Sequence, residues 1–154
     1  MDTSKLVYGL SFAELCDRGQ IVLLKIINSD NYNEALSKEL FDILTDIQQH
    51  INEKPITAEM LRGIMVLGFV NNFIFTNESI VRDEDFGSQL EDEKMLEILK
   101  KSHKANSLRA EAKKYIQQQR NERQDPKLNY GKNEGMWNID FNKINEENEQ
   151  WRYM

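Results

Sequence analysis

Two acidic residues near the start of the chain have a spacing that could bind a metal ion. Glu14 and Asp17 lie three positions apart in a segment with helical spacing, so their carboxylates would share one helix face. Carboxylate oxygens are ligands that a hard cation such as Mg²⁺ prefers. Asp42 and Asp46 form a second pair four positions apart, but the apolar pattern places them on the outer side of their helix. The acidic residues therefore match a Mg²⁺ site only in part, with Glu14 and Asp17 as its ligands.

A second polar group lies in the last predicted helix, where the apolar stripe should continue. His103, Asn106 and Arg109 follow one another at intervals of three and lie along roughly one helix side. If this helix packs antiparallel to the first, Asp17 can pair bidentately with Arg109. Asn106 would then bridge to the backbone near Gly19. A buried ion pair of this kind adds little net stability but fixes which helices meet and in what register.

The same part of the sequence allows an alternative interpretation, a pocket for an anionic ligand such as phosphate or a nucleotide. The cationic residues around this pocket would be Arg18, Lys25, His103 and Arg109. Asp17 and Asn106 would orient the ligand. The other histidine, His50, ends a charged helix surface, and we expect it to be exposed to solvent.

Apolar periodicity predicts four helices that would position these residues. Their predicted ranges are 12–28, 34–51, 58–76 and 88–124. Ser11 with Glu14, and Ser88 with Glu91, match the capping box that begins a helix. The third helix is apolar on most sides, which is typical of a central helix or of an oligomer interface. The sequence therefore predicts an all-α fold, a four-helix bundle with a long last helix, and self-association as a homo-oligomer.

The last thirty residues differ in composition from the predicted bundle. Residues 1–124 form the predicted bundle domain, and residues 125–154 are rich in Asn, Glu and Lys. Six aromatic or apolar residues are set into this polar segment: Tyr130, Trp137, Phe141, Ile144, Trp151 and Tyr153. A disordered tail would rarely contain both of the chain's Trp residues. We expect an extended aromatic C-terminal arm that docks on this protomer, on a second copy or on another protein.

The net charge of −6 makes the chain a poor general binder of nucleic acid. Charge is unevenly distributed, however. Residues 78–97 contain eight acidic and two basic residues, whereas residues 100–123 contain eight basic and two acidic residues. This gradient is the one that complements the helix dipole. A phosphate-binding face on the basic half would use Lys100, Lys101, Lys104, Lys113 and Lys114.

A single cysteine, Cys16, excludes an intramolecular disulfide and is typical of the reducing cytosol. Its apolar neighbours predict a buried, unreactive thiol. The first ten residues lack the pattern of a secretory signal. The longest apolar segment, 64–75, contains Gly and Asn and is too short to span a bilayer. These features predict a cytoplasmic protein without a membrane segment.

Two stretches resemble a group of small, uncharacterised helical proteins of phages and bacteria. They are Leu10–Arg18, continued by Ile21, Leu24, Lys25 and Ile26, and Asn106–Arg109. The resemblance covers about two thirds of the chain and implies that Asp17, Arg18, Lys25, Asn106 and Arg109 belong together. It implies no activity. The paired acids are also similar, in part, to those of the MazG-like nucleotide pyrophosphohydrolases, which hold Mg²⁺ against a triphosphate.

Three functions follow as hypotheses. The first is a non-enzymatic interaction or assembly protein, plausibly phage-encoded and acting in the bacterial cytoplasm, that grips a protein partner through the arm and the last helix. The second is a Mg²⁺-dependent nucleotide hydrolase that uses Glu14 and Asp17. The third is a nucleic-acid-associated factor that uses the basic half of the last helix.

Overall fold

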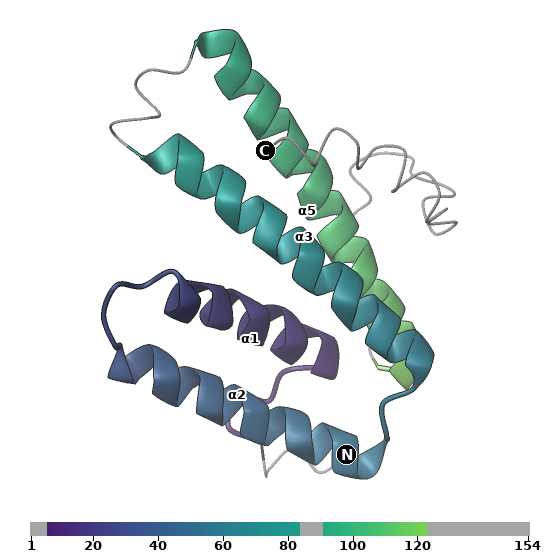
Figure 1. Ribbon diagram of the computed structural model, residues 1–154. Helices are drawn as coiled ribbons and strands as arrows, with labels where there is room; N and C mark the ends of the chain where they lie inside the picture. Colours follow the sequence, from purple (N-terminus) through teal and green to yellow (C-terminus); the bar gives the residue numbers. More distant parts are fainter. Residues whose placement is uncertain (1–5, 84–90, 123–154) are drawn as a thin grey trace. The chain divides into compact units, whose positions relative to one another are not determined.

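The computed structural model describes residues 6–83 and 91–122, and the regular structure within these ranges is helical (Figure 1). The helices are α1 (Phe12–Ile27), α2 (Glu34–Glu53), α3 (Ala58–Arg82) and α5 (Asp92–Arg120). The predicted all-α fold with four helices is therefore confirmed for the described residues. The predicted arm, residues 125–154, lies outside them.

Local signals explain where the first two helices begin. The capping box predicted at Ser11 is present, with the Ser11 hydroxyl accepting from the Glu14 amide at 3.3 Å and the Ser11 amide donating to the Glu14 carboxylate at 3.4 Å. Helix α2 begins after Asn33, whose side chain accepts from the Leu36 amide at 3.1 Å. Both polar caps satisfy amides that have no partner inside the helix.

The third helix is longer than predicted. It continues to Arg82 rather than ending near Thr76. No Gly or Pro interrupts residues 77–82, and the polar Asn77, the first residue after the predicted end, is buried at 2% exposure. Burial of Asn77 extends the packed side of α3 beyond the apolar segment 64–75.

The last helix is shorter than predicted at both ends. It begins at Asp92, and its N-cap Glu91 makes no side-chain capping bond; the proposed cap Ser88 lies outside the described residues. It ends at Arg120 because Asn121 adopts the left-handed conformation, with φ of 55°. Asn is one of the few residues that tolerate this conformation at a helix C-terminus, so the helix stops before Pro126.

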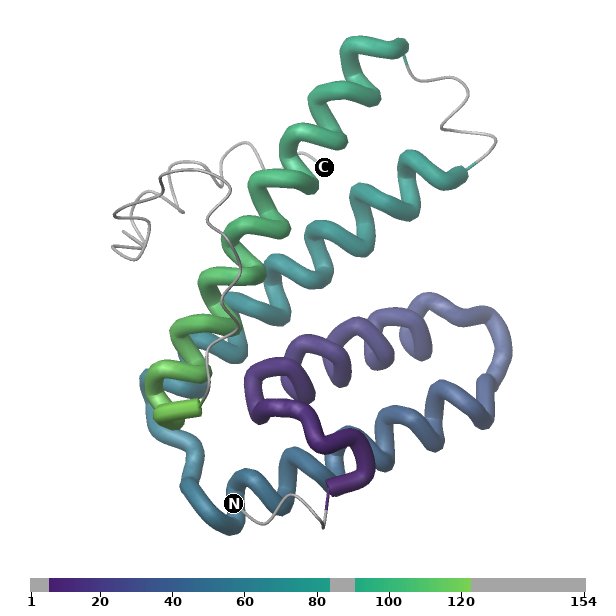
Figure 2. Tube along the Cα trace, turned by 180° about the vertical axis from the view of Figure 1, so that it is seen from behind, coloured from purple at the N-terminus to yellow at the C-terminus, as the bar shows by residue number. Residues whose placement is uncertain are grey.

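Helices α3 and α5 run antiparallel along each other, and α1 packs against α2, α3 and α5 (Figures 1 and 2). The central cluster contains buried side chains of α1, α3 and α5: Phe12, Ala13, Cys16, Met60, Leu67, Ala112 and Ile116. A second cluster joins α1 to α2 through Leu15, Val22 and Ile43. A third, Val70, Ile74 and Ala105, belongs to α3 and α5 alone.

Two glycines mark close approaches between helices. A Cβ at Gly63 would lie 2.9 Å from Cγ1 of Ile116, so only glycine lets α3 approach α5 this closely here. A Cβ at Gly19 would lie 3.2 Å from Cγ2 of Ile43 in α2. These glycines therefore allow close packing of side chains from a neighbouring helix.

Candidate functional site

The buried carboxylate of Asp17 joins three helices. Arg109 of α5 donates from Nε to Oδ1 at 2.8 Å and from Nη2 to Oδ2 at 2.9 Å. The bidentate pair predicted between the first and last helices is therefore present. Asn71 of α3 donates to Oδ1 at 2.9 Å, and Lys113 Nζ lies 3.2 Å from Oδ2. We call Asp17, Asn71, Arg109 and Lys113 the Asp17 cluster.

Two side-chain amides, from Asn71 of α3 and Gln20 of α1, connect the cluster further to the backbone of α3. Asn71 donates a second hydrogen bond to Oε1 of Gln20 at 2.9 Å, and Gln20 donates to the Ile64 carbonyl at 3.0 Å. Neither Asn71 nor Gln20 was among the predicted site residues. The signal that could have found Asn71 was a polar amide inside an otherwise apolar helix.

The charges of the cluster favour an ionised Asp17. Burial would raise the pKa of this carboxyl, but the hydrogen bonds from Arg109 and Asn71 and the charge of Lys113 outweigh burial and hold the pKa below 3.8. One carboxylate balances two cations, Arg109 and Lys113, whose side chains are 27% and 20% exposed. The cluster thus carries a net positive charge at the edge of the core.

The structure does not bring the other predicted members to this cluster. Arg18 instead pairs with Glu39 of α2 at 2.8 Å and lies over the Tyr8 ring at 4.9 Å. It follows Asp17 directly, and the turn of about 100° per residue directs it to another side of α1. Lys25, His103 and Asn106 are exposed. Arg18 therefore does not join Arg109 at Asp17, and the anion pocket stays a prediction. Asn71, rather than Asn106, bridges to α1, and it does so through the side chains of Asp17 and Gln20 instead of the backbone near Gly19.

The residues of the partial Mg²⁺ motif also have other partners. Both oxygens of Asp17 face cations, and Glu14 accepts from the Ser11 amide and hydroxyl. Within residues 6–83 and 91–122, no group of three or more His, Cys, Asp or Glu side chains could hold a metal ion. Asp46 is fully buried, which corrects its predicted outer position: it accepts from the amides of Val7 and Tyr8 at 2.7 and 2.9 Å.

A second polar cluster joins the end of α5 to the ends of α1 and α2. Arg120 donates to the carbonyls of His50 and Lys54, each at 2.8 Å, and to Oε1 of Glu122 at 3.0 Å. The same Glu122 oxygen accepts from the Phe12 amide at 3.3 Å. A cation thus meets the carbonyl end of α2 and a carboxylate meets the amide end of α1, so both charges complement the helix dipoles.

His50 and Cys16 lie beside this second cluster. His50 is 4% exposed, which corrects the prediction that it faces solvent, and its Nε2 lies 3.1 Å from the Leu10 carbonyl. Cys16 is buried as predicted, and burial followed by the charge of Glu122 raises the pKa of its thiol to about 12. A thiol with this pKa is almost wholly protonated at neutral pH and is therefore a poor nucleophile.

The basic residues of α5 do not form one continuous face. Lys113 points to Asp17, and Lys101 pairs with Glu97 at 2.9 Å. Lys100, Lys104 and Lys114 are exposed on another side of the helix. The intervening Glu111 lies near Lys114, and its pKa is raised by burial.

Helix α3 is, by length and composition alone, apolar enough to cross a membrane. Within the fold, however, it contributes to the central cluster and carries Asn71 into the Asp17 cluster. Comparisons with protein-family models, with curated proteins and with solved structures gave no match to this chain.

Proposed function

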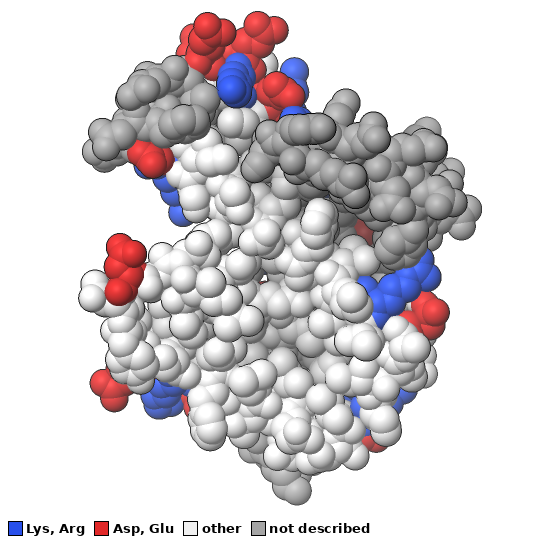
Figure 3. All heavy atoms as spheres, in the orientation of Figure 1, with Lys and Arg blue, Asp and Glu red and all other residues white. Residues whose placement is uncertain are grey.

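We propose that this chain is a non-enzymatic interaction or assembly protein that binds a protein partner through exposed apolar side chains. Figure 3 shows a broad uncharged surface over α1, α2 and α3, with charged side chains at its margins. These helices carry seven large apolar residues that are at least 44% exposed: Leu23, Ile27, Phe41, Leu44, Leu61, Met65 and Phe69. Exposed large apolar side chains in this number are typical of protein interaction sites.

The polar residues support the same proposal. The side chains that could have served chemistry bond to other parts of the fold. Asp17, Arg109 and Arg120 connect one helix to another, and Asp46 connects α2 to the segment before α1. They hold the helices in register, so the apolar surface is presented on a rigid support.

The last helix and the arm complete the proposed binding elements. Leu96 and Leu99 of α5 are 51% and 50% exposed. The sequence of the arm offers Trp137, Phe141 and Trp151, residue types that bury large areas at modest entropic cost. The resemblance of the first and last helices to small phage and bacterial proteins supports a phage-encoded factor acting in the cytoplasm of a bacterial host.

The two alternative functions receive less support. A Mg²⁺-dependent hydrolase would require Asp17 to exchange Arg109 and Lys113 for the metal, and melting temperature with Mg²⁺ and nucleoside triphosphates tests this directly. Of the five lysines predicted for a nucleic-acid-binding face, Lys100, Lys104 and Lys114 are exposed. Such binding would show a steep dependence on salt.

The proposal is tested by partner capture followed by reconstitution. The tagged full-length chain is incubated with extract of its source cells, retained proteins are identified, and the interaction is measured again with purified components. Phe41→Glu with Leu44→Glu, and separately a truncation after Gln124, should each weaken binding by about tenfold or more, because hot spots dominate binding energy.

The matched control is Thr45→Glu, which places the same charge on α2 at an exposed polar position. It should bind as the unmodified chain does. Failure to retain any protein that also binds in purified form would contradict the proposal, as would unchanged binding by both the double variant and the truncation.

A further inference from the structure

The two ring nitrogens of the buried His50 face two different oxygen atoms. Nε2 lies 3.1 Å from the carbonyl oxygen of Leu10, and Nδ1 lies 3.7 Å from Oε1 of Glu122. A carbonyl oxygen can only accept a hydrogen bond, so the neutral ring carries its proton on Nε2 and a lone pair on Nδ1. The lone pair of Nδ1 therefore faces a carboxylate with no proton between them.

The Glu122 carboxylate lacks a donor on one of its two oxygens. Oε1 accepts from Nε of Arg120 at 3.0 Å and from the Phe12 amide at 3.3 Å. Oε2 is buried and has no hydrogen-bond partner within residues 6–83 and 91–122. A buried charged oxygen without a donor is unfavourable. A proton on Nδ1 of His50 would supply a donor to this carboxylate.

The charged groups beside His50 favour uptake of that proton. Asp46 of α2 is fully buried and lies one helical turn before His50. Glu122 adds a second carboxylate, whereas Arg120 adds a buried cation that opposes uptake, as burial of the ring does. Lys54 bonds to a carbonyl of α5 in an exposed position, where water screens its charge. Among these groups, two carboxylates thus act on the ring against one buried cation.

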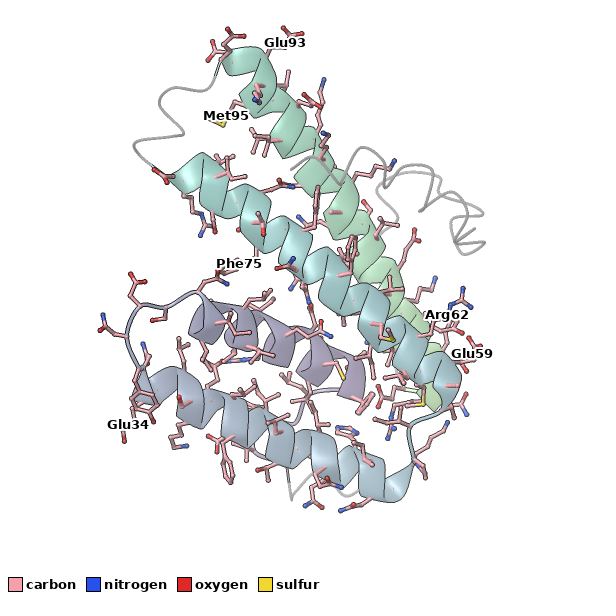
Figure 4. The ribbon with its side chains drawn as sticks, in the orientation of Figure 1. Glu34, Glu59, Arg62, Phe75, Glu93 and Met95 are labelled. Atoms are coloured by element: carbon pink, nitrogen blue, oxygen red, sulfur yellow. The ribbon has the colours of Figure 1, made fainter. Side chains whose placement is uncertain are left out.

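Helices α1 and α3 contribute uncharged or outward-pointing side chains at this junction. The Phe12 ring packs edge-on against the His50 ring, with centroids 6.0 Å apart. Cys16 is buried and keeps its proton at neutral pH, as described above. At the N-terminal end of α3, Glu59 and Arg62 point away from α1 (Figure 4) and pair with each other at 3.6 Å. The charge around His50 is therefore set by groups of α2 and of the end of α5.

We propose that His50 is a proton-operated latch. When Nδ1 binds a proton from solvent, the imidazolium pairs with the Glu122 carboxylate while Nε2 still donates to Leu10. The closed latch then joins the chain before α1, the end of α2 and the chain directly after α5. This inference goes beyond the proposed function, because the latch does not depend on any partner.

The sign of the pH dependence follows from linkage. Only the closed latch places Glu122 beside the ring, so the closed latch binds the proton more tightly than an open one does. Protonation of His50 therefore stabilises the closed form. This contribution is present at low pH and is lost as the pH rises.

Nuclear magnetic resonance of the full-length chain tests proton uptake directly. Two-bond ¹H–¹⁵N spectra from about pH 8 to about pH 5 cover the range in which histidine ordinarily titrates. At the upper end His50 should show Nε2–H alone, and it should gain a proton on Nδ1 as the pH falls while circular dichroism stays unchanged. The exposed His103, the other histidine of the chain, is an internal control and should show both neutral tautomers.

A matched pair of variants tests the role of Glu122. Glu122→Gln keeps an acceptor for Arg120 and for the Phe12 amide but removes the charge. It should weaken proton binding at His50 by about tenfold, because an opposite charge at this distance is lost. Glu53→Gln removes the same charge from an exposed position on α2 and should leave proton binding at His50 unchanged.

Hydrogen exchange tests whether the proton closes the latch. The Phe12 amide donates to Glu122, so its protection, corrected for the intrinsic effect of pH, should rise by up to about tenfold between the two ends of the titration. His50→Gln keeps a donor for the Leu10 carbonyl but cannot bind the proton. In this variant the protection of Phe12 should not change with pH.

Three results would overturn the inference. The first, a His50 that stays neutral in the folded chain down to about pH 5, needs no variant. The others are proton uptake that Glu122→Gln does not weaken, and uptake that leaves the protection of Phe12 unchanged. A latch that titrates as expected in a chain that captures no protein would support this inference and contradict the proposed function alone.

Discussion

The two ends of the α3 and α5 pair are built differently. At the four-helix end, residues 58–73 and 106–122 pack with α1 and α2, and buried polar side chains bond to neighbouring helices or chain ends. These side chains are Asp17, Asp46, His50, Asn71 and Arg120. At the two-helix end, residues 74–83 and 91–105, α3 and α5 bury Ile74, Asn77, Ile98, Ser102 and Ala105. These buried side chains are few, and two of them, Ser102 and Ala105, are small.

This difference predicts unequal stability along one pair of helices. The two-helix end buries only Ile74, Ile98 and Ala105 among its apolar side chains. Regions with few buried apolar contacts open locally at lower free energy than the core does. The four-helix end should therefore determine the free energy of global unfolding. Substitutions at the two-helix end should alter that free energy little.

The largest expected effect is at the four-helix end, from Asp17→Ala. This change leaves Arg109 and Lys113 without their carboxylate at the edge of the core, and it should lower the free energy of unfolding by about 3–5 kcal/mol. Urea denaturation followed by circular dichroism measures the change. Asp17→Leu with Arg109→Met should recover part of the loss, because it removes the carboxylate together with its bidentate partner, while Lys113 and Asn71 still lose their contact with Asp17.

The control for this variant lies at the two-helix end. Glu97→Ala removes the exposed ion pair with Lys101 and should leave the urea midpoint unchanged, because exposed pairs contribute little. Equal losses from the two variants would show that the ends do not differ.

A smaller effect is expected from acid, acting through the same carboxyl. The folded pKa of Asp17 is lowered from 3.8, so its ionisation contributes stability that is present above about pH 4 and is lost as the pH falls through the folded pKa. The difference in unfolding free energy between the unmodified chain and Asp17→Asn should therefore narrow between pH 7 and pH 3. A constant difference across this range would contradict the assigned role.

Local signals explain what could be predicted from the sequence. The capping box at Ser11 and the apolar spacing of α1 act within a few residues, and each is found in the structure. The pairing of Asp17 with Arg109 is predicted from the grouping that the resemblance implies, together with an antiparallel packing of the first and last helices, and the pair is present.

Burial by distant segments explains what could not be predicted. His50 and Asp46 look like outer positions of α2, but Leu10, Val7 and Arg120 cover or contact them from the chain before α1 and from the end of α5. Helical periodicity shows which residues share a face, but not whether a distant segment covers that face.

The smallest effect, and the sharpest contrast, comes from two asparagines of α3. Asn71 and Asn77 are buried to 3% and 2% exposure, but Asn71 donates to Asp17 and Gln20, whereas Asn77 Nδ2 lacks a partner in the described part of the chain. Asn71→Leu should destabilise the fold by about 2 kcal/mol, and Asn77→Leu should stabilise it by about 1 kcal/mol, because it removes a buried donor without breaking a bond at that atom. Thermal unfolding of the two matched variants measures the expected loss of stability from Asn71→Leu and the expected gain from Asn77→Leu. A loss of stability from Asn77→Leu would mean that the two-helix end depends on a polar contact as the four-helix end does.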